Sequence, residues 1–193
     1  MKKIIASTLF ILFYFLPVSL KAEIKTISEG KLDAKIKLIV FESLTCSHCA
    51  DFHINIYPKL KEDFIDKGYA YIEFRNFPLD IAALNASKIA HCKNDGNSEI
   101  LHLLFNNQRL WAKGETINDL NNNLNEFIKK SKLNINIDNC QNNKQIEDHI
   151  LMDRINAVKK FKIESTPTLI INGEKFENHT NYKKLKNYIE KLI

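Results

Sequence analysis

Residues 36–49 read IKLIVFESLTCSHC, an apolar run that leads directly into two cysteines. The apolar part, residues 36–41, is rich in β-branched and aromatic side chains, and this composition predicts a buried strand. Thr45 is a suitable N-cap, so a helix is expected to begin at or near Cys46. This interpretation places Cys46 and Cys49 where a strand passes into a helix.

Two cysteines in this position predict thiol–disulfide chemistry. The Cys46 sulfur would lie beside unpaired N–H groups at the positive end of the helix, where a thiol pKa falls to roughly 3.5–7.5. His48, where it is protonated, adds a further positive partner. Cys49 lies one turn farther along and can form a disulfide with Cys46. A stabilised Cys46 thiolate is a good leaving group, so this disulfide is a strong oxidant. Cys46, Cys49 and His48 are therefore the predicted catalytic residues.

Two other interpretations of the cysteine pair remain open. A Cys-x-x-Cys pair also occurs as half of a zinc site, and it can be a purely structural disulfide. A complete zinc site needs further ligands, but the sequence contains no second Cys-x-x-Cys and no His-x-x-x-His, and Cys92 and Cys140 stand alone. We therefore predict no metal and no cofactor.

The chain after the cysteines continues an α/β pattern. Pro58 interrupts a helical repeat and is expected to kink the helix. Residues 69–77 alternate as a second strand, which gives a βαβ unit with parallel strands. The repeat places four apolar residues on one helical face: Phe52, Ile56, Leu60 and Phe64.

Residues 79–161 show helical periodicity. Thr116 is expected to cap one of these helices, and Asp138 to cap another that continues towards Phe161. The sheet then resumes with a strand at residues 168–171.

The end of the chain completes the pattern. Asn172-Gly173 predicts a hairpin, because both residues accept a positive φ, and an amphipathic helix follows from Tyr182. The order β-α-β, helices, β-β-α is that of an α/β thioredoxin-like fold with an inserted helical domain. We assign residues 23–78 and 162–193 to the thioredoxin-like domain and residues 79–161 to the insertion.

Residues 1–22 have the layout of a secretory signal peptide. Lys2 and Lys3 precede an apolar run, residues 4–16, which is shorter than the about 20 residues of a membrane span. Export to the periplasm with cleavage near Ala22 is expected, and an uncleaved N-terminal anchor is the alternative.

Removal of this segment changes the net charge. The full chain has 28 Lys and Arg and 23 Asp and Glu residues, a net charge of +5. Loss of Lys2, Lys3 and Lys21 reduces it to +2. A charge so near neutral does not favour binding to nucleic acid or to an anionic membrane surface.

The chain resembles the DsbA-type branch of the thioredoxin superfamily, especially its alphaproteobacterial forms. The resemblance rests on FESLTCSHC at 41–49, FRNFPLD at 74–80 and ESTPTLIING at 164–173, with a further similar segment at 104–111, and it extends over nearly the whole mature chain. It implies that Thr166-Pro167 is a cis peptide that faces the cysteines and binds substrate. The alternative is an ordinary trans proline at the start of a strand.

The two remaining cysteines, Cys92 and Cys140, are expected to form a structural disulfide. Leftover cysteines tend to pair in an oxidising compartment, and the resemblance supports this pairing. Two separate buried thiols are the alternative.

The chain departs from the DsbA-type pattern at one position. Many relatives carry an acidic residue six positions before the first cysteine, where this chain has Val40. Glu42 lies two residues later on the same strand face. It either relays a proton for Cys49 or is an exposed or capping glutamate. His53, one turn beyond Cys49, is expected at the surface.

The resemblance implies an oxidase that introduces disulfide bonds into reduced exported proteins and is reoxidised by a membrane partner of the DsbB type. A monomer is expected, because residues 23–35 are too short for a dimerisation domain. A disulfide isomerase or reductase on the same fold is the alternative, since Thr166 before the proline is shared with isomerases. A non-enzymatic chaperone or metal-binding module is a third possibility.

Overall fold

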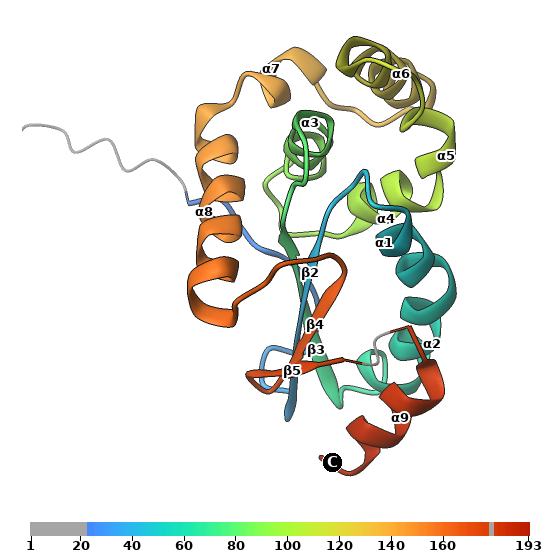
Figure 1. Ribbon diagram of the computed structural model, residues 1–193, viewed down its shortest axis with the longest axis vertical. Helices are drawn as coiled ribbons and strands as arrows, with labels where there is room; N and C mark the ends of the chain where they lie inside the picture. Colours follow the sequence, from blue (N-terminus) through green and yellow to red (C-terminus); the bar gives the residue numbers. More distant parts are fainter. Residues whose placement is uncertain (1–22, 178–179) are drawn as a thin grey trace, which may run out of the picture.

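The computed structural model describes residues 23–177 and 180–193, so the predicted signal segment lies outside the described residues. A five-stranded sheet with the order β1-β3-β2-β4-β5 forms its centre (Figure 1). β2 is parallel to β3 and antiparallel to β4, while β1 and β5 run antiparallel to their neighbours. The expected fold class is confirmed. The strands are β1 Ile27–Gly30, β2 Ile36–Glu42, β3 Ala70–Asn76, β4 Thr168–Ile171 and β5 Glu174–Phe176.

The alternation of β2 divides the core between the two faces of the sheet. Leu38 and Val40 pack with the helical run that follows the cysteines and with α9 (Tyr182–Glu190). Ile39 and Phe41 face the opposite side, where they pack with Ala157 of the long helix α8 (Lys144–Phe161). In Figure 1 these helices lie on opposite sides of the sheet. β2 is therefore buried on both faces, as its continuous apolar run predicts.

The helical run after Cys46 is irregular but continuous. It comprises α1 Ser47–Asp51, the π-helical segment η1 Phe52–Ile56, α2 Tyr57–Leu60 and a second π-helical segment, η2 Lys61–Ile65. Pro58 lies in the first turn of α2, where a missing N–H is tolerated. The irregularity expected at Pro58 thus takes the form of π-helical turns on either side of α2. All four residues of the predicted apolar face are buried.

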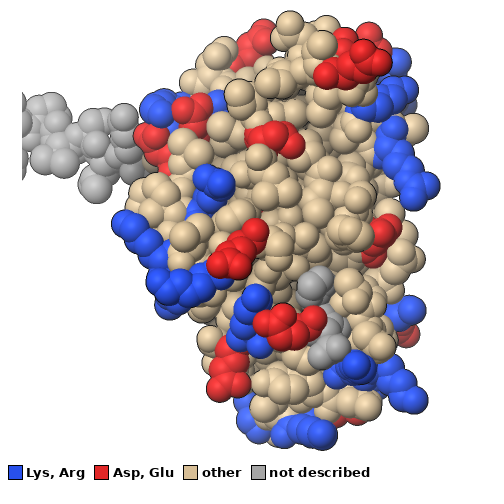
Figure 2. Space-filling view, viewed as in Figure 1, with Lys and Arg blue, Asp and Glu red and all other residues tan. Residues whose placement is uncertain are grey.

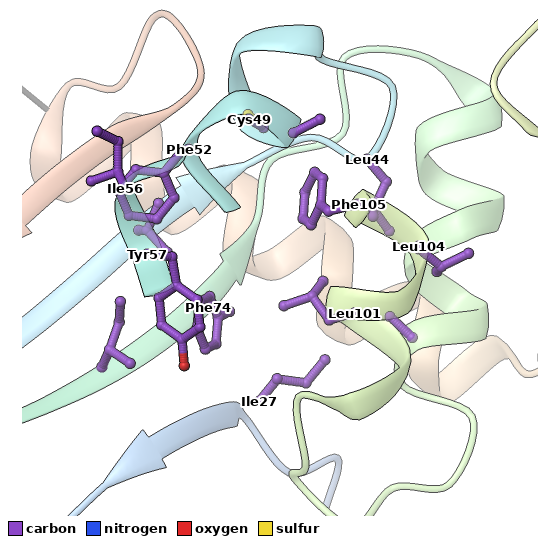
Figure 3. Packing of buried hydrophobic residues seen from close by; sticks show 14 of the residues in the cluster. Ile27, Leu44, Cys49, Phe52, Ile56, Tyr57, Phe74, Leu101, Leu104 and Phe105 are labelled. Atoms are coloured by element: carbon purple, nitrogen blue, oxygen red, sulfur yellow. The ribbon is translucent and has the colours of Figure 1, made fainter. Parts of the chain in front are cut away.

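Apart from α8, which covers one face of the sheet, the helices of residues 79–161 gather at one end of the sheet, towards the top of Figure 1. They are α3 Ile81–Ala90, α4 Glu99–Asn106, α5 Gln108–Trp111, α6 Ile117–Lys130 and α7 Ile137–Gln141. One buried cluster runs from Phe74 on the sheet through Phe105 on α4 to Trp111 on α5. Figure 3 shows Leu101, Leu104 and Phe105 beside residues of the sheet and of the helical run. The division at residues 79 and 161 stays our assignment, because the two parts share a core.

Two details of the sequence prediction were wrong, and two were right. Asp138 does not cap a helix that continues to Phe161. Asn136 caps the short helix α7 and Asn143 caps α8, since each asparagine side chain accepts a backbone N–H hydrogen bond. β1 was not predicted, because its four residues carry little alternation. The Thr116 cap of α6 and the positive φ of the Asn172-Gly173 turn are confirmed. In the described part of the chain, no helix is both long and apolar enough to cross a membrane.

Candidate active site

Cys46 lies where the chain leaves β2 and enters α1. It is itself the N-cap of α1, with φ −79° and ψ 119°. The sequence predicted Thr45 as the N-cap, one position too early. The Thr45 hydroxyl donates instead to Asp80 Oδ2 at 2.7 Å. Because an N-cap side chain faces the first free amides of its helix, the Cys46 sulfur lies close to the N–H groups of His48 and Cys49.

These surroundings lower the pKa of the Cys46 thiol to about 5. The largest contribution is a hydrogen bond from the Cys49 thiol, which outweighs the opposing effect of partial burial. The side chain of Thr166 and the backbone amides of Cys49 and His48 act in the same direction. Cys46 is about half-buried, so its sulfur is both a stabilised thiolate at neutral pH and accessible to a substrate.

Cys49 behaves in the opposite way. It is fully buried, and this burial, together with the hydrogen bond to Cys46 and the nearby Glu42 carboxyl, raises the pKa of its thiol far above the usual range. The backbone amide of Ser43 opposes the shift without cancelling it. The pair therefore has one exposed nucleophile and one buried partner that remains a protonated thiol.

His48 contributes to this site through its backbone. Its amide is among the groups that lower the Cys46 pKa, while its side chain is exposed. The additional effect of the imidazole on oxidising power stays a prediction, tested by the redox equilibrium of His48→Ala.

Thr166 and Pro167 lie beside Cys46. The peptide between them is cis, and the Thr166 carbonyl oxygen is 3.4 Å from the Cys46 sulfur. The pairing of Phe41 with Thr168 explains this proximity, since it brings the start of β4 next to the end of β2. The structure thus brings together Cys46, Cys49, Thr166 and Pro167, as the sequence predicted. Their roles in substrate binding belong to the proposal below.

Gln108 is a site residue that the sequence analysis missed. Its buried side-chain amide donates to the carbonyl oxygens of Leu44, at 2.8 Å, and of Cys46, at 2.9 Å. Gln108 is in α5, so these two hydrogen bonds hold the loop that contains Cys46 against the inserted helices. Gln108 lies in the segment 104–111, which resembles the DsbA-type branch, but nothing in the sequence assigns this role to its side chain.

His53 was expected at the surface, and this prediction was wrong; for Glu42, the alternative of an exposed glutamate was wrong as well. Both are buried, with 3% and 2% of their surface exposed. His53 Nε2 lies 2.7 Å from Glu42 Oε2, and the His53 ring stacks on Phe105 at 4.0 Å between centroids. The sequence position is misleading because the π-helical segment η1 turns His53 towards the sheet.

Comparison with known proteins agrees with this geometry. A family model described as thioredoxin matches residues 22–191. The chain belongs to the thioredoxin family. Within it, the chain is similar to alpha-DsbA1 from Wolbachia pipientis, with 31% identity and a TM-score of 0.77 over 90% of this chain and 93% of that chain. It is also similar to BdbD from Bacillus subtilis, with 25% identity and a TM-score of 0.71 over 86% of this chain and 92% of that chain.

Curated relatives carry matching names. A putative protein-disulfide oxidoreductase from Rickettsia bellii is 28% identical over 78% of this chain, and this chain spans 58% of that protein's length. Disulfide bond formation protein D from Bacillus subtilis is 28% identical over 85% of this chain and 75% of that protein. The chain is therefore a member of the DsbA-type thiol–disulfide oxidoreductases, as its motifs predicted.

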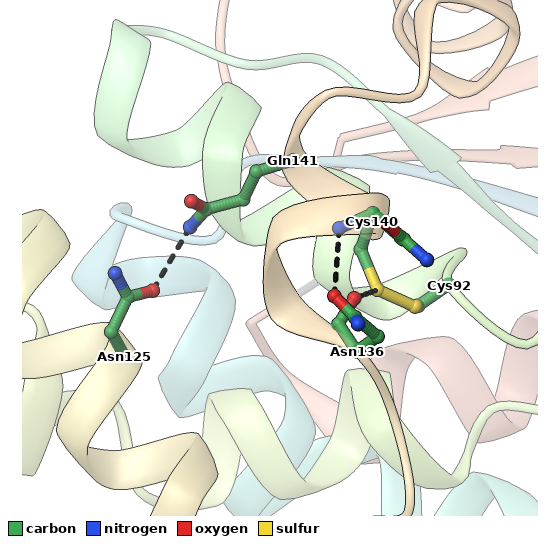
Figure 4. Close-up of a disulfide and its surroundings, with 6 residues drawn as sticks. Cys92, Asn125, Asn136, Cys140 and Gln141 are labelled. Carbon is green, nitrogen blue, oxygen red and sulfur yellow. Dashed lines mark hydrogen bonds between the residues drawn. A yellow bond between two sulfur atoms is a disulfide. The ribbon is translucent and has the colours of Figure 1, made fainter.

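A second pair of cysteines lies within the inserted helices of this DsbA-type protein. Cys92 follows α3 and is bonded to Cys140 in α7, with 5.1 Å between their Cα atoms (Figure 4). In the same view the Cys140 amide donates to the Asn136 carbonyl at 3.1 Å, and Gln141 donates to Asn125 of α6 at 3.0 Å. The Cys92–Cys140 disulfide thus links the end of α3 to α7, and α7 also contacts α6.

Replacing both Cys92 and Cys140 with Ala should lower the free energy of unfolding by about 2–4 kcal/mol, because the bond closes a long loop. The sequence separation of 48 residues makes the entropic effect on the unfolded chain large. Denaturant unfolding measures the loss. The redox equilibrium of Cys46 and Cys49 should remain that of the wild type, and a shifted equilibrium would contradict a purely structural role.

The Cys46 pKa predicts a pH-dependent stability of the reduced form. The folded pKa is about 5 and the ordinary value is 9.0. Between these values the unfolded chain binds a proton that the folded protein does not, so the free energy of unfolding rises with pH. This gain should disappear as the pH falls through 5, and it should be absent from the disulfide form. Thiolate absorbance locates the pKa, and a Cys46 pKa near 9 would refute the assignment.

Proposed function

We propose that this protein is an exported oxidase that transfers the Cys46–Cys49 disulfide to reduced exported proteins. A substrate thiolate attacks the Cys46 sulfur, Cys49 leaves, and a second substrate thiol displaces Cys46 from the mixed disulfide. The substrate gains a disulfide and the protein keeps two thiols.

The observation that carries this proposal is the separation of the two thiol pKa values. A thiolate stabilised at neutral pH makes the reduced form more stable relative to the disulfide, and the disulfide is then a stronger oxidant. The Cys46 pKa of about 5 therefore favours an oxidase over a reductase.

Thr166 and Pro167 are the proposed substrate-binding residues. An extended peptide that pairs with the backbone of Thr166 would place its own sulfur next to Cys46, and backbone pairing selects no particular side chain. A cavity of about 530 Å³ opens on another side of α1. The exposed apolar side chains of Ile54 and Leu110 line it and would accommodate apolar residues of unfolded substrates.

The surface charge is compatible with varied substrates. Figure 2 shows basic and acidic side chains interspersed around the edge of one face, with few charges in its central area. Recognition of many different substrate proteins does not need a surface whose electrostatic potential has a single sign. Location in the periplasm, loss of residues 1–22, a monomeric state and reoxidation by a membrane partner of the DsbB type complete the proposal.

The redox equilibrium with glutathione is the test of this function. We expect a reduction potential nearer to the roughly −120 mV of a strong oxidant than to the roughly −270 mV of thioredoxin. A potential at or below that of glutathione would contradict the oxidase role.

Two alternatives make different predictions. A disulfide isomerase or reductase would reduce insulin and reshuffle scrambled ribonuclease faster than it oxidises reduced ribonuclease. A metal-binding module would bind zinc tightly through Cys46 and Cys49, which a titration of the reduced protein detects. Within residues 23–177 and 180–193, no group of three His, Cys, Asp or Glu side chains is arranged to hold a metal ion.

A further inference from the structure

The loop between β2 and α1 is held by side chains from two of the inserted helices. Gln108 Nε2 donates to the carbonyl oxygens of Leu44, at 2.8 Å, and of Cys46, at 2.9 Å. The hydroxyl of the residue between them, Thr45, donates to Asp80 Oδ2 at 2.7 Å. Three successive residues of the loop are therefore fixed by partners that lie at least 35 residues farther along the chain.

Gln108 is chemically suited to hold two carbonyl groups at once. A primary amide nitrogen carries two N–H donors, and here each donor has its own carbonyl oxygen. Gln108 is only 7% exposed, so water does not readily replace these bonds. Leu44 is 2% exposed, and its carbonyl belongs to neither β2 nor α1. The position of one amide group therefore determines where the two carbonyl groups lie.

Asp80 connects the same loop to α3. Its Oδ1 atom accepts from the Ala83 amide at 2.7 Å and caps α3, while its Oδ2 atom accepts from the Thr45 hydroxyl. The loop is thus tied to the first turn of a ten-residue helix. Asp80 and Thr45 are more exposed than Gln108, so water competes for this bond and its effect should be smaller.

The Cys46 carbonyl group belongs to the peptide unit that starts α1. The peptide unit is planar, so the Cys46 oxygen and the Ser47 amide move together. The same oxygen accepts from the amides of Cys49, at 3.1 Å, and of Ala50, at 3.2 Å, which are the first hydrogen bonds of the helix. Holding this oxygen therefore fixes the direction of the first turn of α1 relative to the Cys46 side chain.

This direction matters because the first turn carries groups that stabilise the Cys46 thiolate. The amides of His48 and Cys49 both lower the pKa of the Cys46 thiol. Hydrogen bonds weaken steeply as their angle and length depart from the optimum. In the disulfide the Cys46 sulfur carries no negative charge, so the same amides stabilise it much less. Precise orientation of the first turn therefore stabilises the reduced protein more than the oxidised protein.

We propose that Gln108 and Asp80 are positioning residues, which orient the first turn of α1 towards the Cys46 sulfur and thereby make the disulfide a stronger oxidant. The proposal deepens the oxidase function above and rests on it. Both side chains bond to carbonyl or hydroxyl groups of the loop, so they act on the sulfur through the loop. The exchange itself is unchanged: the substrate thiolate bonds to Cys46, the electron pair of the broken disulfide goes to Cys49, and neither positioning residue gains or loses a proton.

A Gln108→Met variant tests the proposal, because methionine has a similar length but no N–H donor. We expect the equilibrium of the Cys46–Cys49 pair with glutathione to shift by about tenfold towards the disulfide, the usual net effect of losing one or two hydrogen bonds. For a two-electron couple this shift is a decrease of about 30 mV in the reduction potential. The Cys46 thiolate absorbance should move to higher pH by up to about one unit, because one pKa unit is the same tenfold change.

The stability of the two redox forms separates positioning from packing. The free energy of unfolding of Gln108→Met is measured with the cysteine pair reduced and again with it oxidised. Loss of packing alone would lower both values equally and leave the redox equilibrium unchanged. Loss of positioning should lower the stability of the reduced form further, by the same factor of about tenfold that the glutathione equilibrium shows.

Gln141→Met is the matched control. It makes the same substitution within the inserted helices, and it removes a hydrogen bond from Gln141 to Asn125 at 3.0 Å that does not involve the cysteine loop. This variant should lose some stability equally in both redox forms and keep the wild-type equilibrium with glutathione.

Thr45→Val tests the contact with Asp80. Valine keeps the shape of threonine but cannot donate to the carboxylate, so the central residue of the loop is released. We expect a shift of the glutathione equilibrium in the same direction as that of Gln108→Met, and smaller. The substitution is mild, so it also decides the question if Gln108→Met does not fold.

A wild-type glutathione equilibrium in Gln108→Met, or in Thr45→Val where Gln108→Met does not fold, would overturn the proposal. An equal loss of stability in the two redox forms of the variant would overturn it as well. These tests compare a variant with the wild type, so they hold whatever the wild-type potential is. Failure of the wild-type protein to oxidise reduced ribonuclease would instead contradict the oxidase function and leave the positioning test in place.

Discussion

Replacing Cys46 with Ser should reduce the oxidation of a dithiol substrate to the rate without protein. The Cys46 sulfur is the accessible atom of the pair, and its pKa of about 5 makes it the favoured point of attack and the better leaving group. A serine hydroxyl cannot form a disulfide, so no oxidising equivalent remains at the site. Recovery of activity in reduced ribonuclease measures the effect.

Replacing Cys49 with Ala gives the informative contrast. Cys46 keeps its position beside Thr166, so it should still react with a small mixed disulfide, but the adduct should persist because no internal thiol resolves it. Mass spectrometry detects the trapped adduct. The same trap in Cys46→Ala, or residual oxidase activity in Cys46→Ser, would show that the roles of the two cysteines have been assigned in the wrong order.

Local signals predicted much of the fold. The apolar run of residues 36–41 became the central strand β2, and the Asn172-Gly173 hairpin has the predicted backbone. Such elements are specified by residues close together in the sequence. β1 was missed because its four residues are ordered by pairing with β3, which lies far along the chain. The single helix expected from Asp138 is divided at Asn142. Asn136 caps the short helix α7, and Asn143 caps the long helix α8.

The site was predicted less evenly than the fold. The cysteine pair and the Thr166-Pro167 segment carry motifs, and the pairing of β2 with β4 brings them together. No motif assigns a role to Gln108 or His53, and their places depend on how α4 and α5 pack against the helical run. His53 in particular is buried by tertiary contacts with Phe74 and Phe105, which outweigh the usual surface preference of histidine.

These placements explain why the inserted helices belong to the active site. Gln108 of α5 binds the loop that contains Cys46, and Asp80, the N-cap of α3, binds Thr45 of the same loop. The insertion therefore supports a centre whose two sulfur atoms lie at the N-terminus of α1. Its packing should then determine the stability of the whole molecule as well as that of the helices.

Replacing Trp111 with Ala should lower the free energy of unfolding by about 3–5 kcal/mol, the usual cost of removing a large buried aromatic side chain. Trp111 is fully buried, and its indole N–H donates to the Leu104 carbonyl at 2.9 Å. For a protein of this size the loss corresponds to a decrease in Tm of roughly 6–20 °C. Leu110→Ala on the same helix is the control, because its side chain is 58% exposed and its loss should cost less than about 0.5 kcal/mol.

The number of steps in the unfolding transition of Trp111→Ala tests whether the inserted helices and the sheet share one continuous core. Trp111 belongs to the same buried cluster as Phe74 of the sheet, so we expect the helices and the sheet to unfold together in one step. Far-ultraviolet circular dichroism and the loss of the acid-shifted Cys46 thiolate should then have the same midpoint. Two separate transitions, with the thiolate signal surviving the first, would instead show that the inserted helices unfold as an independent unit.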